Sequence, residues 1–539
     1  MNRIHEYLLD FFMTLFALST LALWGITLSG GSFRTYAVIM LAVPLVAAYL
    51  VMVNNRGHIP PAPVETSTEC YKNRFGIEYV VIAALLLGIF FSESSLIMIA
   101  LLLVIVFLLL RKTVTAPQPF TSFSALEKSP FIPGAALVIA VTYTLVSHRP
   151  TQDDALYLFF GLLPLNQPMQ AINLLPIYDT GRMLVSYPSI EAVVSYWTGI
   201  SYLQVYYLVV PALAAMLSVF AYYGLFQQSG SGYAGVLTFM TIIILILWGD
   251  ETRSPGNFSF ATLGIGKAMF YTAVCPYLVS SALGVLTRRP GSNLRLAAAS
   301  ISGIGLTQSA IVLVPLFFTG LILAAWLVYR EPPKRARYLP FLTGLAVFAV
   351  LAACIVAYLG KIPTTKPHDS GLREALDVVF GAGLRGPLSI ACVGLLPLLA
   401  QDSARHKALT ALCVALLLIA LNPVIVYLAG QAVWSLTWRL QWLLLLAAMT
   451  ATGIFLAADF IARGKPSVRL LLCALGLAGF AMLGQTTFSE SNRNRIGFPQ
   501  IKPPPTINGV FKRHHTGQYK LHAEYRLENG RICMTNGCY

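Results

Sequence analysis

Long apolar runs recur along almost the whole of this 539-residue chain. Each has about 15 to 22 residues, and one helical crossing of the ~30 Å hydrocarbon core of a bilayer needs about 20. Charged residues make up only 11% of the chain, whereas soluble domains carry about 25%. The runs also lack the alternation of an outer-membrane barrel. The sequence therefore predicts an all-α integral membrane protein, a polytopic helical bundle of about 13 to 15 transmembrane helices.

Hydropathy also predicts where the spans begin. The first run, 8–29, is longer than a signal-peptide core and has no clear small-x-small cleavage site, so we predict a retained helix. The predicted spans begin near Leu8, Tyr36, Tyr79, Leu96, Ile132, Tyr206, Val236, Ala268, Leu296, Ile311, Phe341, Pro387, Ala408, Leu440 and Val468.

Lys and Arg residues collect in alternate loops, which is typical of loops that stay in the cytoplasm. The stretch 296–329 is too long for one helix and has basic residues before and after it, which favours two short helices that meet near Thr307, Gln308 and Ser309. The N-terminus is then cytoplasmic and the C-terminal tail lies outside. The net charge of +15 reflects these loops, so we expect membrane lipids as partners and no nucleic acid.

Four segments on the predicted outer side are longer than turns, namely 148–204, 249–266, 360–386 and the basic tail 486–539. The first contains the strongest chemical feature of the chain, the adjacent carboxylates of Asp153 and Asp154, just after the span that begins near Ile132. A carboxylate there can act as a general base or hold a metal ion. The alternative is a helix N-cap, because Asp at a helix start satisfies free N–H groups.

An Asp-Asp pair in a large outer loop after a membrane span resembles the hallmark of the GT-C superfamily, whose members are membrane glycosyltransferases that use polyprenyl-phosphate sugars. The order of further short motifs is similar to a bacterial subgroup of unassigned function. These motifs are Tyr178-Asp179-Thr-Gly181-Arg182, Tyr187-Pro188-Ser189-Ile-Glu191, Gly266-Lys267-Ala268, Asn422-Pro423 and Trp438-Arg439-Leu-Gln-Trp442. The likeness runs from about 150 to 456. The four spans before Asp153 depart from the simplest GT-C plan, in which the acidic loop follows the first helix.

The resemblance implies a domain organisation and a bacterial inner-membrane location with a periplasmic tail. Residues 1–131 form N-terminal transmembrane helices. Residues 132–485 form a GT-C-like transmembrane core with its outer loops at 148–204, 249–266 and 360–386. Residues 486–539 form the periplasmic tail.

A polyprenyl-phosphate donor needs cations at headgroup depth, and Lys267, Arg439 and Arg385 are each predicted at an outer helix end. The alternative is that they are interfacial anchors that reach the lipid headgroups. The tryptophans Trp197, Trp434, Trp438 and Trp442 fall near the same boundary, where an aromatic belt is the default and stacking on a sugar is the alternative.

Further loop residues are candidates for acceptor or substrate contacts. These are Asp179, Arg182, Tyr187, Glu191, Asp250 and Glu251. For Asp250 and Glu251 the simpler interpretation is a pair of solvated loop residues. The sequence has no residues at the spacing of metal ligands. The sequence does not decide whether a divalent cation, held by Asp154, is a cofactor.

The leading expectation is an inverting glycosyltransferase with Asp153 as the general base, while Asp154 either orients that base or binds a metal. It would move a sugar from a polyprenyl-phosphate donor to a glycan, lipid or protein acceptor. Two alternatives are a transporter or flippase for a lipid-linked sugar and a non-catalytic scaffold of an envelope-assembly complex. A transporter usually carries ionisable residues at mid-membrane; the exceptions near span ends here are Asp10 and Asp459, most simply facing water or protein.

The C-terminal tail holds Cys533 and Cys538, with the turn-forming pair Asn536-Gly537 between them. In an oxidising outer compartment the two thiols are predicted to form a disulfide. The alternative is a solvated basic tail with two free thiols.

The predicted orientation can be tested with reporters fused along the chain. Fusions after Val114 and Gly464 should report cytoplasm, and fusions after Gln170 and Gly517 should report the outer side, because the basic loops alternate. A cytoplasmic signal after Gly517 would contradict the helix pair in 296–329 and invert the C-terminal half.

Overall fold

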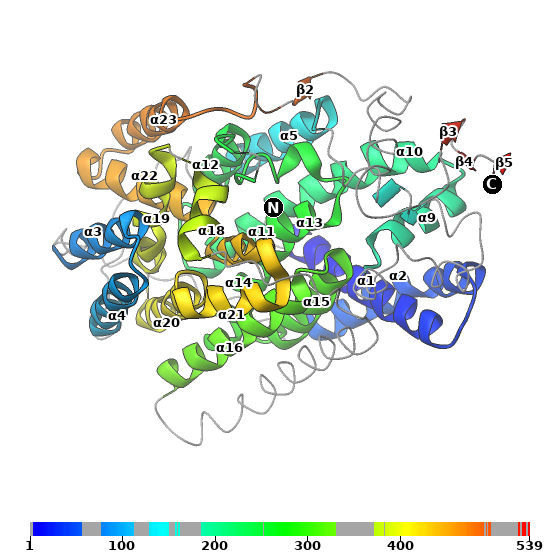
Figure 1. Ribbon diagram of the computed structural model, residues 1–539, viewed down its shortest axis with the longest axis horizontal. Helices are drawn as coiled ribbons and strands as arrows, with labels where there is room; N and C mark the ends of the chain where they lie inside the picture. The colour runs from blue at the N-terminus through cyan, green and yellow to red at the C-terminus, as the bar shows by residue number, and fades with distance from the viewer. Residues whose placement is uncertain are drawn as a thin grey trace.

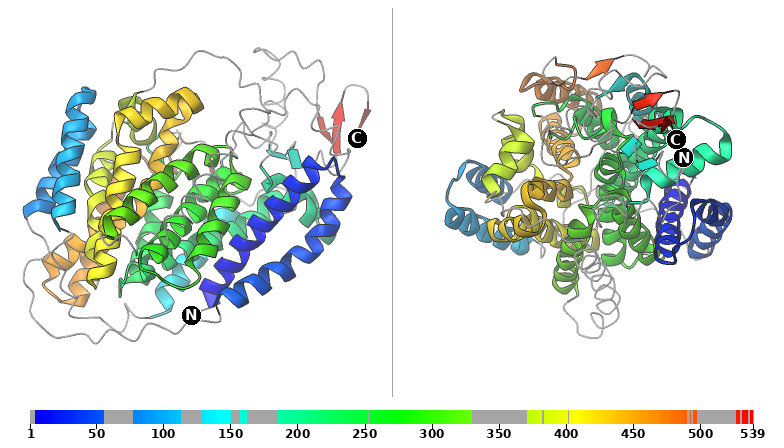
Figure 2. Two further views of the ribbon diagram at one scale, coloured as in Figure 1. Left: turned by 90° about the horizontal axis from the view of Figure 1, so that it is seen from below. Right: turned by 45° about the vertical axis from the view of Figure 1, so that its right-hand side comes forward.

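The chain folds as an all-α polytopic membrane protein, seen here in a computed structural model (Figure 1). The structure describes residues 4–55, 77–112, 129–149, 157–158, 160–161, 185–251, 253–329, 371–381, 383–400, 402–489, 492, 494–496, 526–528, 531–534 and 537–538. Figure 2 shows most of the long helices side by side as a bundle.

Seven described helical stretches are long and apolar enough to cross a membrane. They are Ile4–Leu28, Phe33–Asn55, Tyr202–Gln228, Gly266–Leu286, Ala310–Val328, Ser403–Ala420 and Thr437–Ala462. Five shorter apolar helices accompany them, namely Glu78–Phe91, Ser95–Arg111, Phe131–Val146, Ala234–Leu247 and Pro466–Met482. These helices confirm the predicted fold class. The span predicted near Phe341 lies outside the described residues.

The first four helices form two hairpins that lie at opposite edges of the bundle (Figures 1 and 2). One hairpin is α1 (Ile4–Leu28) with α2 (Phe33–Asn55), and α1 packs on α15 (Ser292–Leu306). The other is α3 (Ile77–Phe91) with α4 (Ser95–Lys112). It packs on α19 (Arg385–Ala391) and α20 (Ser403–Ala420). The two hairpins therefore flank the core from two sides.

The core helices follow the predicted spans closely. They are α5 (Phe131–Val146), α11 (Val210–Gln228), α12 (Ala234–Leu247), α14 (Cys275–Leu286), α16 (Ala310–Val328), α20, α22 (Leu446–Ala462) and α23 (Pro466–Met482). The predicted helix pair in 296–329 is confirmed, because α15 ends at Leu306 and α16 begins at Ala310. The span predicted from Pro387 differs: α19 is short and continues as the 3-10 helix Val393–Leu399, which contains Pro397. A proline lacks the N–H that an α-helical ladder needs.

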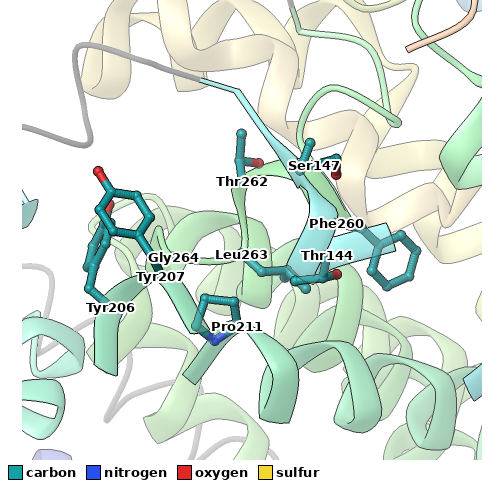
Figure 3. Close-up of a pocket in the computed structure, with 10 residues that line it drawn as sticks. Thr144, Ser147, Tyr206, Tyr207, Pro211, Phe260, Thr262, Leu263 and Gly264 are labelled. Carbon is teal, nitrogen blue, oxygen red and sulfur yellow. The ribbon is translucent and has the colours of Figure 1, made fainter. Parts of the chain in front are cut away.

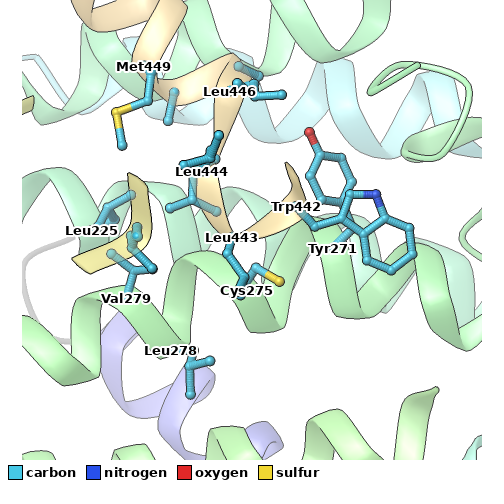
Figure 4. Close-up of a cluster of buried hydrophobic side chains, with 14 of the residues drawn as sticks. Leu225, Tyr271, Cys275, Leu278, Val279, Trp442, Leu443, Leu444, Leu446 and Met449 are labelled. Carbon is cyan, nitrogen blue, oxygen red and sulfur yellow. The ribbon is translucent and has the colours of Figure 1, made fainter. Parts of the chain in front are cut away.

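Large apolar side chains fill the space between α11, α14 and α22 (Figure 4). Leu443 and Leu444 lie between Leu225, Val279 and Met449 on one side and Trp442 and Tyr271 on the other. Cys275, Cys392, Cys413 and Cys473 are buried free thiols, and a buried free cysteine behaves as a small apolar residue. The remaining short helices are α9 (Tyr187–Thr198), α10 (Tyr202–Gln204), α13 (Gly266–Met269), α18 (Leu372–Phe380) and α21 (Pro423–Val433).

Two groups of buried charged residues in the described helices form ion pairs. Near the start of α1, the Arg295 guanidinium contacts Asp10 at 2.7 Å and Glu6 at 2.9 Å, and Arg289 also contacts Glu6. The Tyr277 hydroxyl donates to Asp10 at 2.8 Å. This network joins α1 to α14 and α15, so Asp10 faces protein.

A second buried ion pair joins α22 to α23. Arg469 contacts Asp459 at 2.6 Å, and its guanidinium lies 4.5 Å from the centroid of the Tyr233 ring. Both charged side chains are almost fully buried. Removing one partner would leave the other charge buried and uncompensated.

We therefore expect Asp459→Ala to destabilise the protein by about 3–5 kcal/mol. The double variant Asp459→Leu/Arg469→Met should recover most of that loss, because it leaves no buried charge. Thermal unfolding in detergent measures both. Asp377→Asn is the control, since Asp377 forms an exposed pair with Arg373 and should cost at most about 0.5 kcal/mol. An unchanged melting temperature for Asp459→Ala would contradict the role of this pair.

Candidate functional site

The acidic pair lies between α5 and α9, in residues 149–187, which we call the acidic loop. Asp153, Asp154, Asp179 and Arg182 lie outside the described residues. The described residue before the pair, Arg149, is buried. Its N–H donates to the Ala261 carbonyl at 3.1 Å, and its guanidinium donates to the Asn257 carbonyl at 3.5 Å.

The far end of the same loop contacts the same neighbouring segment. Tyr187, at the start of α9, is fully buried and donates its hydroxyl to the Leu263 carbonyl at 2.8 Å. Both described ends of the acidic loop are thus hydrogen-bonded to residues 257–263.

That segment leads into α13, where Gly266 precedes Lys267. A Cβ on Gly266 would lie 2.4 Å from the Leu306 carbonyl oxygen and 3.2 Å from the Tyr187 ring. Only glycine allows α9, α13 and the end of α15 to approach so closely. Lys267, the next residue, is 6% exposed, and its Nζ lies 5.3 Å from the centroid of the Phe258 ring.

Three cations and three aromatic rings form what we call the cation–aromatic cluster. Its members are Arg253, Phe258, Lys267, Trp438, Arg439 and Trp442. The guanidinium carbons of Arg253 and Arg439 lie 5.2 and 5.3 Å from the centroid of the Trp438 ring. The Phe258 and Trp442 rings lie 5.2 and 5.3 Å from Trp438.

Arg439 connects this cluster to the turn between α15 and α16. Its guanidinium donates to the Ser309 hydroxyl, and Ser309 lies at the position predicted for an outer turn. Lys267 and Arg439, predicted separately as donor-phosphate ligands, therefore lie at one cluster.

Trp438 and Trp442 were expected in an aromatic belt, and this expectation is wrong for both. They are only 2% and 3% exposed, because the rings pack against the cations and each other. Trp197, in contrast, is 44% exposed, as a belt residue would be.

Two π-helical turns lie next to the site. One covers Val205–Val209 and the other Phe270–Val274, and each stands two residues before a proline, Pro211 or Pro276. A proline ring clashes with the carbonyl four residues earlier, and the wider turn accommodates it. π-helical turns are frequent at functional sites. Here one presents Tyr206 and the other Tyr271, whose ring lies 5.7 Å from Trp442.

A small recess opens beneath the start of the acidic loop (Figure 3). It is lined by five residues that carry a hydroxyl group and five that do not, namely Thr144, Ser147, Tyr206, Tyr207, Thr262, Pro211, Phe260, Ala261, Leu263 and Gly264. The lining contains no charged residue.

Arg385 is not arranged as a phosphate ligand. It is fully buried and donates to five backbone carbonyls, those of Leu247, Phe480, Ala481, Gly484 and Gln485. One of its Nη atoms also lies 3.4 Å from Asp250. Its N–H groups are thus used to hold the ends of α12, α19 and α23 together.

Asp250 and Glu251 differ from each other. The Asp250 side chain is 7% exposed and accepts from the Gln485 N–H at 2.6 Å. Burial raises the pKa of this carboxyl, although the Arg385 charge opposes the rise. The prediction of a solvated pair is therefore wrong for Asp250 and fits Glu251, which is exposed.

Glu191 is a fully buried carboxyl on α9. Tyr202 donates its hydroxyl to one carboxyl oxygen at 2.9 Å. The other oxygen has no hydrogen-bond partner in the described part of the chain. Burial raises the pKa of Glu191 well above its ordinary value of 4.5. A Cβ on Gly161 would clash with the Tyr202 hydroxyl, so the acidic loop packs directly on this pair.

The first residues of the predicted tail belong to the site rather than to a separate arm. The Thr487 hydroxyl contacts Tyr143 at 3.0 Å, and Asn492 contacts Asn257 at 2.6 Å. The strand β2 (Arg495–Ile496) pairs with β1 (Ser147–His148) at the exit of α5. The tail therefore covers the start of the acidic loop.

Further along the tail, β3 (Arg526–Glu528), β4 (Arg531–Met534) and β5 (Gly537–Cys538) form a small antiparallel sheet. Its register places Cys533 opposite Cys538. Gly537 pairs with Met534, so the connection is 535–536, one residue earlier than the predicted Asn536-Gly537 turn. The disulfide itself stays a prediction.

Among the described residues, no three His, Cys, Asp or Glu side chains gather as they would around a metal ion. Asp154, the residue considered for a metal, lies outside them.

Comparisons with known proteins add no assignment. No protein-family model matches the chain, and no curated protein matches it.

The buried Glu191 carboxyl predicts a pH dependence. The folded protein keeps a proton that the unfolded chain loses above about pH 4.5, so this residue lowers stability as the pH rises through that value. Glu191→Gln, which cannot ionise, should melt a few degrees higher than wild type at pH 8 and at the same temperature at pH 4. Glu251→Gln, on an exposed side chain, is the control. Equal melting temperatures at pH 8 would contradict a neutral buried Glu191.

Proposed function

We propose that the chain is an inverting, GT-C-type glycosyltransferase of the bacterial inner membrane. It would move a sugar from a polyprenyl-phosphate donor to a glycan, lipid or protein acceptor on the periplasmic side. One observation carries the proposal: both ends of the acidic loop are hydrogen-bonded to the segment 257–263, which leads into Lys267.

Chain length supports a meeting of the acidic pair and the cations. Asp153 follows Arg149 by four residues, and four residues span at most about 14 Å. Arg149 itself is hydrogen-bonded to Asn257, the neighbour of Phe258 in the cation–aromatic cluster. A carboxylate within that radius could serve a substrate whose phosphate lies at the cluster.

In the proposed reaction the acidic pair and the cations have different roles. Asp153 would accept the proton of the acceptor hydroxyl while that oxygen attacks the anomeric carbon of the sugar. The bond from that carbon to the phosphate oxygen breaks, and the electron pair leaves with the lipid phosphate. Lys267 and Arg439 would stabilise the leaving charge. Asp154 would orient the base or hold a divalent cation.

The other predicted loop residues take supporting roles in this proposal. Tyr187 and Glu191 are fully buried, so they would hold the acidic loop in place rather than touch the acceptor. Asp250 is engaged with Arg385 and Gln485. Asp179 and Arg182 remain candidates for the acceptor.

A transporter for a lipid-linked sugar is the alternative that uses the same cations. It would be expected to carry ionisable groups along a path through the membrane. Asp10 and Asp459, the acidic exceptions noted in the sequence, each form an ion pair with an arginine. These two residues therefore favour a structural role and give no support to transport.

Transfer of radiolabelled sugar from a lipid extract by the purified protein tests the proposal. Asp153→Asn should abolish transfer, because an amide cannot accept the proton, whereas Asp154→Asn should retain some activity. Asp377→Asn is the control for loss of one carboxylate, and it should leave transfer unchanged. Full transfer by Asp153→Asn would contradict its role as base, and no transfer by the wild-type protein with any lipid fraction would favour a scaffold.

A further inference from the structure

The recess beneath the start of the acidic loop contains a polar group that the proposed reaction does not use (Figure 3). Thr144, in the last turn of α5, lines this recess and is only 4% exposed. Its hydroxyl has no hydrogen-bond partner within the described part of the chain. A buried hydroxyl without a partner is costly, so a ligand that forms a hydrogen bond there would relieve it.

Thr144 differs in this respect from other buried threonines of the bundle. A threonine in a helix can donate its hydroxyl to the carbonyl four residues earlier. Thr238, Thr241, Thr450 and Thr452 do so at 2.7–2.8 Å. The Thr144 hydroxyl forms no such bond, and it is therefore available to a ligand in the recess.

The walls of the recess come from three parts of the chain. Figure 3 shows Tyr206 and Tyr207, from one π-helical turn, on one side and Thr144 with Phe260 on the other. Gly264 lets its segment approach that turn closely, because a Cβ there would lie 3.1 Å from the Tyr206 ring. The recess is therefore built by the packing of α5, the π-helical turn and the segment that leads into α13.

The size and composition of the recess restrict what it can bind. The centre of a water molecule can occupy about 20 Å³ of it, and about 10–15 Å³ on this measure holds one water. One or two non-hydrogen atoms fit, whereas a whole sugar ring does not. A phosphate or carboxylate is excluded because the lining offers no cation to pair with it. A hydroxymethyl group matches the mixed lining, because it has one polar oxygen and one apolar carbon.

We propose that the recess binds the exocyclic hydroxymethyl group of the transferred sugar, so that the donor carries a hexopyranose with a free 6-hydroxyl. This inference rests on the proposed function and names its sugar class. The oxygen of that group would form a hydrogen bond with the Thr144 hydroxyl. A pentopyranose lacks the group and would leave Thr144 without a partner, so Thr144 is a specificity residue.

The recess lies where the sugar of a bound donor is expected. Residues 260–264, which form one wall, stand between Phe258 and Lys267 of the cation–aromatic cluster in the sequence. Each residue of this wall is at most four residues from one of the two, and four residues span at most about 14 Å. A phosphate at Lys267 and a sugar at the recess can therefore belong to one donor molecule.

Binding of synthetic farnesyl phosphoryl glycosides to the purified full chain in detergent tests the proposal. The probes form three matched pairs: glucoside with xyloside, galactoside with L-arabinoside, and mannoside with lyxoside. Within each pair the pentoside lacks only the hydroxymethyl group. Farnesyl methyl phosphate is the reference without a sugar, and farnesol is the uncharged control. In at least one pair, titration calorimetry should give a dissociation constant about tenfold lower for the hexoside, because one hydrogen bond and one buried methylene are worth about that factor.

Thr144→Val replaces the hydroxyl with a methyl group of similar size. It should reduce the preference for the hexoside about fivefold and leave binding of the pentoside nearly unchanged. Thr450→Val is the matched control, because the Thr450 hydroxyl is also buried in a helix but donates to the Leu446 carbonyl. Without ligand, Thr144→Val should melt at or above the wild-type temperature, whereas Thr450→Val should melt lower, since only the control loses a hydrogen bond.

The outcomes separate the two proposals. Hexosides and pentosides that bind equally, and more tightly than farnesol, would overturn the inference and leave the proposed function standing; the recess would then bind water only. A preference for the hexoside that survives Thr144→Val would overturn its assignment to this recess. Phosphate probes that all bind no better than farnesol would overturn both the inference and a lipid-phosphate donor.

Discussion

The buried guanidinium of Arg385 organises the end of the bundle that carries the site. Helix C-termini leave carbonyls without partners and carry partial negative charge. Arg385 donates to such carbonyls at the ends of α12 and α23 and also lies beside Asp250. No apolar residue could satisfy these groups away from water. The loop that follows α12 starts from this fixed point and carries Arg253, Phe258 and Lys267 into the cation–aromatic cluster.

The same constraint explains which features could be predicted from the sequence. Span positions followed from hydropathy, and the helix pair at 296–329 followed from basic residues at both its ends, because a bilayer penalises misplaced charge. The shared membrane depth of Lys267 and Arg439 could be predicted from the sequence. Their positions within the membrane plane, and therefore their meeting at one cluster, could not. Arg253 was not among the predicted cations, because its contact with Trp438 depends on how two segments distant in the sequence pack together.

Other features could not be predicted because one residue type can have several roles. An arginine near a helix end can reach lipid, a ligand or backbone carbonyls, and Arg385 has the third role while the sequence favoured the first two. The tail was predicted as a segment separate from the transmembrane core. Thr487 is nevertheless hydrogen-bonded to Tyr143 in α5, and Asn492 to Asn257 in the loop after α12. The π-helical turns had a usable signal: each stands two residues before Pro211 or Pro276, in a span otherwise free of helix breakers at its start.

The two buried carboxyls near the site show how its electrostatics depend on burial. Asp250 has a cation beside it, whereas the Glu191 carboxyl accepts a hydrogen bond from the neutral Tyr202 hydroxyl. Burial raises the pKa of both. A neutral Glu191 adds no negative charge beneath the acidic loop, which packs on its partner Tyr202. Neither of these buried carboxyls therefore leaves an uncompensated negative charge, because Glu191 keeps its proton and Asp250 lies beside Arg385.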